Sequence, residues 1–275
     1  MQHLPLPVTA AGDEAVVNEL AEDAFWAPHV ADWIAAYRTY QAGGGSPFAV
    51  SPHNFGAGVG SRQYSLFDSR GGSGELRRMR RKEGLKSCPV CGSPVTGNLD
   101  HYLPRNAYPE FAIMRANLVP ACQHCNSGVK GKTIHGGNPR RFIHPYFDPW
   151  AAQPIWLVEI IPPYKAATFR PRPLPELQAP NSEIVSFHLE NVLGIQFDLS
   201  MANHWSSLPG QLKMRDETLT SASVTHQVNI ELILARLSKG ENSWDAALLR
   251  GIASDAAAIE HLRQEAIGTV LPPMA

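Results

Sequence analysis

The four cysteines of this sequence are the residues whose spacing most directly suggests chemistry. They form two Cys-x-x-Cys pairs, Cys88 with Cys91 and Cys122 with Cys125, and 30 residues separate the pairs. Zinc favours four thiolate ligands in a tetrahedron, and each pair can present two sulfurs from one tight turn. A closed shell of four thiolates leaves no position for substrate, so we expect a structural zinc ion. A redox-active dithiol and unpaired core cysteines are the alternatives, but the strand and helix context of redox chemistry is missing.

An Asp-His pair lies between the two cysteine pairs. Asp100 and His101 stand in an alternating apolar run that leads to Pro104. Imidazole has an ordinary pKa of about 6.5, so His101 can accept a proton from water near neutral pH, as hydrolysis requires. The Asp100 carboxylate can bind Mg²⁺, which takes one or two protein oxygens and keeps waters and phosphate oxygens. A single histidine is more often a structural side chain than a catalytic base, so the residues around His101 must decide between these two roles.

The residues around this pair predict two short strands and a helix. Alternation over residues 99–103 predicts the first strand, "NLVPAC" predicts the second, and a helix is expected after Cys122, ending at Gly136-Gly137. Adjacent residues of a flat strand point to opposite faces. Asp100 and His101 can therefore share a pocket only if the strand bends at its end, which Pro104 would favour.

This central segment resembles the HNH endonucleases of the ββα-metal, or His-Me finger, superfamily. The pattern "LDHYLP…YPEF…NLVPACQHCNSGVK" carries the resemblance over roughly residues 85–148. Asn117 opens the second strand and Asn126 follows the second cysteine pair, with asparagine where the family name expects histidine, so the site is of the HNN type. The resemblance implies that His101 is the general base and that Asp100 and Asn126 bind catalytic Mg²⁺ or Mn²⁺. It also implies that Asn117 ties down the loop that carries the histidine.

Basic residues are concentrated around the cysteines. Residues 70–141 contain 13 Lys/Arg and 4 Asp/Glu, a net charge of +9, whereas the remainder contains 11 and 21, a net charge of −10. A local positive field is typical of phosphate-backbone binding, although a solvated surface helix would also explain the run "ELRRMRRKEGLK". The residues expected to contact nucleic acid, DNA first, are Arg105, Lys130, Lys132, Arg140, Arg141 and His144.

The flanking regions predict a scaffold, and the fold class expected is α+β: a zinc-stabilised ββα-metal HNH core embedded in a mainly helical scaffold with a few additional strands. Residues 1–74 are expected to form two helices divided at Pro28 and a Gly/Ser-rich arm, and residues 75–150 the nuclease core. Residues 151–275 are expected to form strands at "IWLVEIIPP", "EIVSFHLENV" and "IQFDLS", a proline-rich loop "RPRPLPELQAP", and two closing helices. This last region would serve as scaffold or bind a partner, with the stripe of "NIELILARLS" packed in the core.

Composition and motifs together predict a class of function. Apolar residues make up 44% of the chain and charged residues 18%, which is ordinary for a folded soluble protein. There is no signal-peptide pattern and no long apolar window, so we expect a cytoplasmic protein without membrane contact. The sequence predicts a divalent-metal-dependent endonuclease that hydrolyses DNA. The resemblance further implies an effector of phage defence or restriction, with a regulatory partner such as an ATPase. A non-catalytic zinc-stabilised nucleic-acid-binding or adaptor module and an RNA-cutting toxin are the alternatives.

Overall fold

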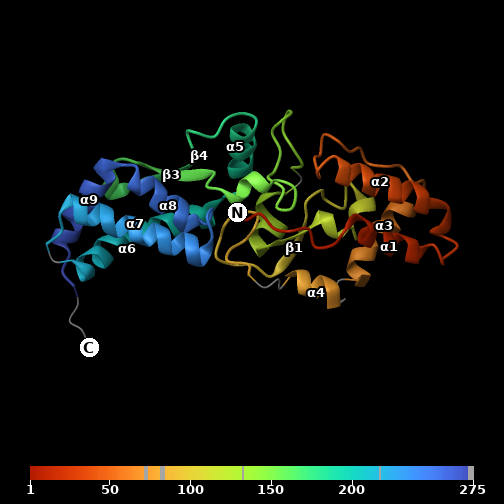
Figure 1. The fold of residues 1–275 in the computed structure, drawn as a ribbon, viewed down its shortest axis with the longest axis horizontal. Coiled ribbons are helices and arrows are strands. Elements are labelled where there is room, and N and C mark those ends of the chain that lie inside the picture. Colours follow the sequence, from red (N-terminus) through yellow and green to blue (C-terminus); the bar gives the residue numbers. More distant parts are fainter. Residues whose placement is uncertain (71–73, 81–83, 132, 217, 272–275) are drawn as a thin grey trace.

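A computed structural model describes residues 1–70, 74–80, 84–131, 133–216 and 218–271. The described chain mixes many helices with two small antiparallel sheets, so the expected α+β class is confirmed at that level. The regions follow one another in chain order along the long axis of the molecule: the first helices lie at one end, the first hairpin in the middle and the last helices at the other end (Figure 1). Within the described residues, no helix combines the length and the apolar character needed to cross a membrane.

The N-terminal region is helical, and it contains one helix more than the sequence indicated. Helices α1 (Ala10–Leu20) and α2 (Val30–Ala42) pack together, and a short 3-10 turn, Ala27–His29, separates them at Pro28 as expected. The Gly/Ser-rich segment was expected to be an arm, but Val59–Arg70 forms helix α3. Val59 is buried, and Leu66 and Phe67 pack against the core about two turns later. This helical spacing outweighs the glycine and serine content of the segment.

The central hairpin is close to the prediction. Strand β1 (Asn98–His101) pairs antiparallel with β2 (Leu118–Ala121), and His101 lies opposite Leu118. Helix α4 (Gly74–Arg80) packs on the hairpin. The helix expected after Cys122 is only a short helical segment, whose part Cys125–Val129 is a π-turn. It ends beside Gly131, whose φ of +52° is in the left-handed region where glycine commonly terminates helices.

The C-terminal region is more helical than predicted. Strand β3 (Trp156–Ile161) is present as expected, and its partner β4 (Thr168–Pro173) lies partly in the segment predicted to be loop. Prolines are tolerated there because β4 is an edge strand of a two-stranded sheet. The strands predicted from "EIVSFHLENV" and "IQFDLS" were wrong, since these residues belong to helices α5 (Asn181–Val192) and α6 (Ile195–Arg215). The α5 helix is buried on a wide face, and a short run of apolar residues does not distinguish such a helix from a strand.

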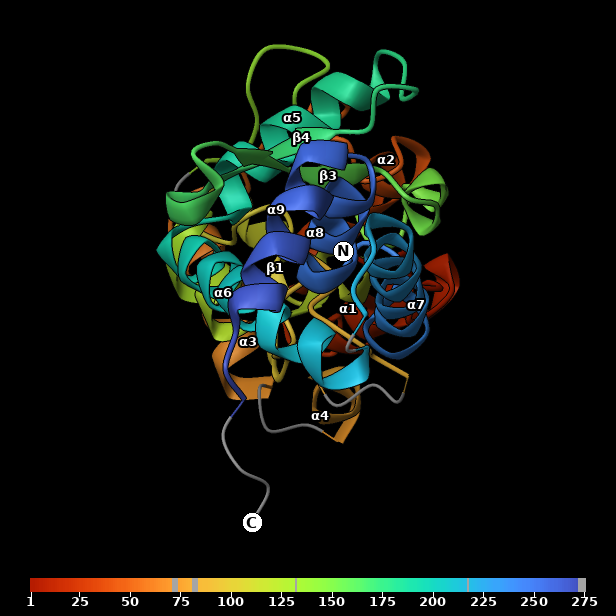
Figure 2. The same cartoon turned by 90° about the vertical axis from the view of Figure 1, so that its left-hand side faces the viewer.

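Three helices close the chain: α7 (Ser221–Lys239), α8 (Trp244–Ala253) and α9 (Ala256–Gly268). Figure 2 looks onto this end, with α6 and α7 on opposite sides and α8 and α9 between them. The predicted core stripe of α7 was wrong. Its members are 41–65% exposed, and the helix instead buries Val224, Val228 and Ala235 against its neighbours. The exposed stripe consists of Ile230, Ile233, Leu234 and Leu237.

Helix α8 lies against β3 at Gly251, which gives the first testable prediction. A Cβ atom at Gly251 would lie 1.7 Å from the backbone oxygen of Val158, so Gly251→Ala must push helix and strand apart. Overpacking of this kind lowers the free energy of unfolding by about 1–3 kcal/mol or more. Chemical denaturation followed by tryptophan fluorescence measures the change.

Gly210→Ala in α6 is the matched control, because a Cβ atom at that position would meet no neighbouring heavy atom within 4 Å. Alanine is favoured over glycine within a helix by up to about 1 kcal/mol, so this variant should be neutral or more stable. Equal destabilisation by both substitutions would contradict the close contact between α8 and β3.

Candidate functional site

The four cysteines converge on one point, as the sequence predicted. All four are buried, and their Sγ atoms lie within 4.8 Å of one another. Cys91 Sγ and Cys122 Sγ are 3.7 Å apart. A tetrahedral site with Zn–S bonds of about 2.3 Å has S···S edges of about 3.8 Å, whereas a disulfide needs about 2.05 Å. The sulfurs are therefore spaced as ligands of a metal ion such as zinc.

Turns and backbone donors position these sulfurs. The Cys122 N–H donates to Cys88 Sγ at 3.3 Å, and the Cys125 N–H donates to Cys122 Sγ at 3.4 Å. The Gly92 N–H donates to the Cys88 oxygen at 2.8 Å and closes the first turn. The φ of Gly92 is +84°, in the left-handed region that favours glycine. Backbone N–H groups directed at sulfur stabilise the thiolate form that binds metal.

The first cysteine turn also anchors the C-terminal helices. His188 of α5 donates through Nε2 to the Val90 oxygen at 2.7 Å, because its Nδ1 accepts the Ile143 N–H at 3.0 Å. Trp244 of α8 donates through Nε1 to the Cys91 oxygen at 2.7 Å. Burial lowers the pKa of His188 to about 3, so its ring is neutral near pH 7. Two helices thus depend on the shape of one cysteine turn.

Replacing a cysteine ligand tests the metal centre. Cys125→Ser should reduce bound zinc from about one ion per chain to a small fraction, because a four-thiolate site loses a ligand and its closed shell. Structural zinc contributes directly to folding, so the melting temperature should also fall sharply. Elemental analysis and circular dichroism measure the two effects.

Val95→Ser, an exposed position on the loop after the first cysteine pair, is the matched control and should keep both zinc and stability. A parental protein that folds fully after exhaustive chelation, without bound metal, would contradict the structural role.

A cleft of about 400 Å³ opens beside the hairpin and brings predicted site residues together. Strand β1 ends at His101, and Asp100 and His101 both line the cleft in spite of their adjacent positions. Asn126 lines it from the turn that follows the second cysteine pair, with Arg105 and Lys130 nearby on the wall. The metal centre borders the same space, because Cys125 also lines it.

His101 is held in one orientation and one tautomer. Its Nε2 lies 2.9 Å from the Ala112 backbone oxygen, which can only accept, so Nε2 carries the proton. Among the residues that the structure describes, no hydrogen bond occupies Nδ1, which therefore keeps a free lone pair. Burial lowers the pKa of His101 to about 4, and the nearby charges of Arg105 and Lys130 act in the same direction. The ring is neutral at pH 7 and able to accept a proton.

Asp100 shares its carboxylate with a buried lysine. The Lys130 ammonium donates to Asp100 Oδ2 at 2.9 Å and to the backbone oxygens of His101 and Tyr102, each at 2.7 Å. Burial raises the pKa of Asp100, and the Lys130 charge offsets part of that rise. Lys130 is only 7% exposed, so it lies inside the cleft and not on the outer surface where the sequence analysis expected a phosphate contact.

Asn117 fastens the loop that follows His101. Its side chain is fully buried, and its Oδ1 accepts the Leu103 N–H at 2.8 Å. Its Nδ2 donates to the oxygens of Leu103 and Phe111 at 3.0 and 3.2 Å. Tyr40 of α2 donates to the same Oδ1 at 3.2 Å. These hydrogen bonds hold the backbone of the loop at Leu103 and Phe111. Tyr40 was missed, because it lies 77 residues away and no local pattern marks it.

Two other predicted phosphate contacts are internal. His144 is fully buried, with Nε2 2.8 Å from the Tyr40 hydroxyl and Nδ1 accepting the Tyr146 N–H at 3.1 Å. Burial holds its pKa well below the usual range. Arg141 makes two hydrogen bonds to the Asp148 carboxylate, at 2.6 and 2.7 Å. The polar groups of both residues are therefore engaged within the protein, where they stabilise the loop after the hairpin.

The remaining predicted contacts have different surroundings. Arg140 is exposed and pairs with Glu190 at 2.8 Å. Lys132 lies outside the described residues. Arg105 lies at the cleft, with its guanidinium carbon 4.0 Å from the centre of the Tyr64 ring. The same guanidinium pairs with the Asp68 carboxylate at 2.9 Å, so Arg105 lines the cleft with a partner already in place.

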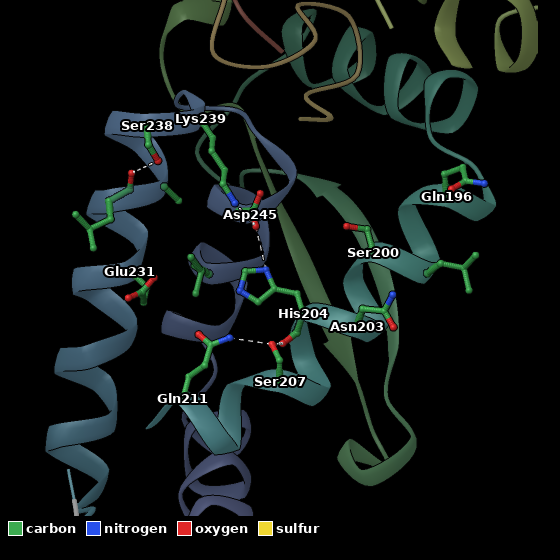
Figure 3. Close-up of a pocket in the computed structure, with 14 residues that line it drawn as sticks. Gln196, Ser200, Asn203, His204, Ser207, Gln211, Glu231, Ser238, Lys239 and Asp245 are labelled. Carbon is green, nitrogen blue, oxygen red and sulfur yellow. Dashed lines mark hydrogen bonds and ion pairs between the residues drawn. The ribbon is translucent and has the colours of Figure 1, made fainter. Parts of the chain in front are cut away.

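A second cavity of about 750 Å³ lies between α6, α7 and α8 (Figure 3). Its polar centre is an ion network in which Asp245 pairs with His204 Nδ1 at 3.1 Å and with Lys239 at 2.9 Å. Burial raises the pKa of Asp245, but these contacts outweigh it and lower the value to about 2. Ser207 donates to the backbone oxygen of His204 and accepts from Gln211. No described hydrogen bond joins the Ser207 hydroxyl to the His204 ring, so the network lacks a nucleophile paired with a base.

Comparison with known proteins gives one partial likeness. No protein-family model and no solved structure matches the chain. A stretch of 64 residues, 23% of the chain, is 47% identical to a protein of Escherichia phage lambda called Protein ea31. The chain matches 22% of the length of that protein. The likeness is to a phage protein whose name states no activity.

The buried pair of Lys130 and Asp100 predicts a stability effect. Lys130→Met removes the partner of a buried carboxylate and leaves two backbone oxygens without their donor. Breaking a buried pair from one side costs about 3–5 kcal/mol. Denaturant unfolding at pH 7 should show a loss of that order.

The double variant Lys130→Met with Asp100→Asn should recover part of the loss, because it removes the unpaired charge. Lys165→Met, at an exposed position, should change stability little. A Lys130 variant as stable as the parent would contradict the burial of this pair.

Proposed function

We propose that this protein is an HNH endonuclease that uses a divalent metal ion to hydrolyse phosphodiester bonds of DNA. The observation that carries the proposal is the setting of His101. A backbone carbonyl fixes the proton on Nε2, and Nδ1 stays available in a cleft that Asp100 and Asn126 also line. A base of fixed tautomer beside oxygen ligands suits hydrolysis of a phosphate ester.

Each residue has a distinct task in this proposal. His101 takes a proton from the attacking water at Nδ1, which its low pKa keeps unprotonated at pH 7. Asp100 and Asn126 would hold Mg²⁺ or Mn²⁺ through their side-chain oxygens, and a hard cation accepts such ligands. When bound, the ion polarises the phosphoryl oxygens and stabilises the charge on the departing oxygen. Arg105 at the cleft wall would position the phosphate.

The resemblance to HNH endonucleases supports the same assignment, because it matches the histidine, both asparagines and the cysteine pairs. A zinc ion on the cysteines would be structural, and Asn126 follows Cys125 directly, so that centre sets where the Asn126 amide lies. For the biological setting we propose an effector of phage defence or restriction that acts in the cytoplasm, with a regulatory partner such as an ATPase. The partial likeness to a phage protein fits a phage-related setting.

Substitution of His101 tests the chemistry. His101→Ala should slow nicking of supercoiled plasmid, in the presence of Mg²⁺ or Mn²⁺, by about 10²–10⁴-fold, the usual contribution of a general base. Its zinc content and circular dichroism should match the parent, because the ring is neutral and makes one described hydrogen bond. His226→Ala, at an exposed position of α7, is the matched control and should cut at the parental rate.

Three outcomes would contradict the proposal in whole or in part. A His101→Ala protein that nicks at the parental rate would show that His101 is not the general base. A parental protein that binds plasmid but never nicks it with either metal favours the zinc-stabilised binding or adaptor module. Cleavage of RNA alone, in a parallel assay, would keep the chemistry and change the substrate to that of an RNA-cutting toxin.

A further inference from the structure

Lys130 and His144 are buried and Arg141 is paired with Asp148, which leaves open which cations near the cleft face solvent. Helix α4 provides them. Its sequence GELRRMR has an apolar face, on which Leu76 and Met79 pack against Leu99 and Leu118 of the hairpin. Leu99 also lines the cleft, so α4 is attached to the same hairpin that carries the proposed active site. Figure 1 shows α4 beside β1 at the edge of the molecule.

The acidic residue of α4 is already engaged. Glu75 forms an ion pair with Arg115, and Arg115 is held in turn by Asp13 at 2.9 Å. Arg77 and Arg78 lie on the exposed side of the helix. Within the described chain, neither guanidinium forms a salt bridge. The outward face of α4 therefore presents two positive charges that no described carboxylate compensates.

A further arginine, Arg105, lines the cleft itself. The Arg105 guanidinium stacks on the Tyr64 ring of α3, donates to the Tyr64 oxygen at 3.0 Å and pairs with the Asp68 carboxylate at 2.9 Å, so its charge is partly compensated. Tyr64 is 38% exposed, so the stacked pair borders solvent. Both basic positions belong to elements packed around one hairpin, and arginine is well suited to phosphate oxygens because its fork donates two parallel hydrogen bonds.

We propose that Arg77 and Arg78 of α4 bind the phosphate backbone of the DNA strand that enters the cleft. The inference rests on the proposed function, since it names the surface by which that site receives its substrate. The contacts are to backbone phosphates, so they add affinity and orientation without base preference. A solvated surface helix is the alternative, in which the two arginines contact only water.

The salt dependence of binding separates these two readings. A fluorescent duplex of about 20 base pairs is titrated with the His101→Ala protein, which keeps the DNA intact, at salt concentrations from about 50 to 200 mM. Each phosphate neutralised in B-DNA contributes about 0.9 to the slope of log K against log salt. Adding Arg77→Gln and Arg78→Gln should therefore reduce the magnitude of the slope by about 1.8, and should weaken binding about 10- to 100-fold at about 0.1 M salt.

Arg170→Gln with Arg172→Gln is the matched control. These arginines are also exposed, but they lie on β4 and pair with Glu159. The control pair should leave the slope and the affinity unchanged. Zinc content and circular dichroism of both variants should equal those of the parent, because all four residues are exposed.

The outcomes distinguish this inference from the proposed function. An unchanged slope in the α4 variant overturns the inference, even if plasmid is nicked normally. Equal losses in the α4 and β4 variants overturn it too, because the effect would then be one of net charge. A reduced slope together with a parental protein that nicks no nucleic acid supports the α4 surface and rejects the nuclease. A slope that falls for an RNA duplex but not for DNA overturns the assignment to DNA.

Discussion

The convergence of four cysteine sulfurs in the interior is the constraint on which the rest of the structure depends. Cys88 and Cys91 shape a turn whose carbonyls receive the side chains of His188 and Trp244, and these belong to two helices of the C-terminal region. Cys122 follows the second strand of the hairpin, and Cys125 stands directly before Asn126. One centre therefore sets both the wall of the cleft and the attachment of the distant helices. A metal ion there would couple folding of the two regions, because a site of four thiolates does not exist in the unfolded chain.

A second set of contacts keeps the cleft in shape from the opposite side. Asn117 satisfies three backbone groups of the loop after His101, and Tyr40 connects Asn117 to His144. Because His144 Nδ1 accepts a backbone N–H, its Nε2 donates to the Tyr40 oxygen and the Tyr40 hydroxyl proton is directed to Asn117. Buried polar groups that are all satisfied specify one arrangement of a core. The N-terminal helix α2 thus contributes to the site without supplying any residue to the cleft.

Local pattern predicted the hairpin and the cysteine cluster well, because short-range spacing sets both. The Cys-x-x-Cys turns and the strand that carries Asp100 need few distant contacts to define them, although Asn117 ends a 3-10 turn just before β2 and does not open that strand as predicted. Burial of charged residues was not predictable in this way. Lys130 is internal because its ammonium donates to the Tyr102 carbonyl, 28 residues earlier in the chain. His144 is internal because its ring contacts the hydroxyl of Tyr40 from α2. The helices α5 and α6 were misread because their short apolar runs fit either periodicity, and neighbours that the sequence does not reveal decided the outcome.

The ammonium of Lys130 has a consequence for the resting state of the cleft. Its positive charge lies against Asp100, the one carboxylate that the described residues contribute to the cavity wall. The charges of Lys130 and Asp100 therefore cancel before any ion binds. A doubly charged ion entering alone would create an excess of positive charge in a poorly screened space, where such an excess is costly. An ion that arrives together with an anionic phosphate ester would create no such excess of charge. Under the proposed chemistry, the free protein would therefore hold catalytic metal weakly, and metal and substrate would assemble as a pair.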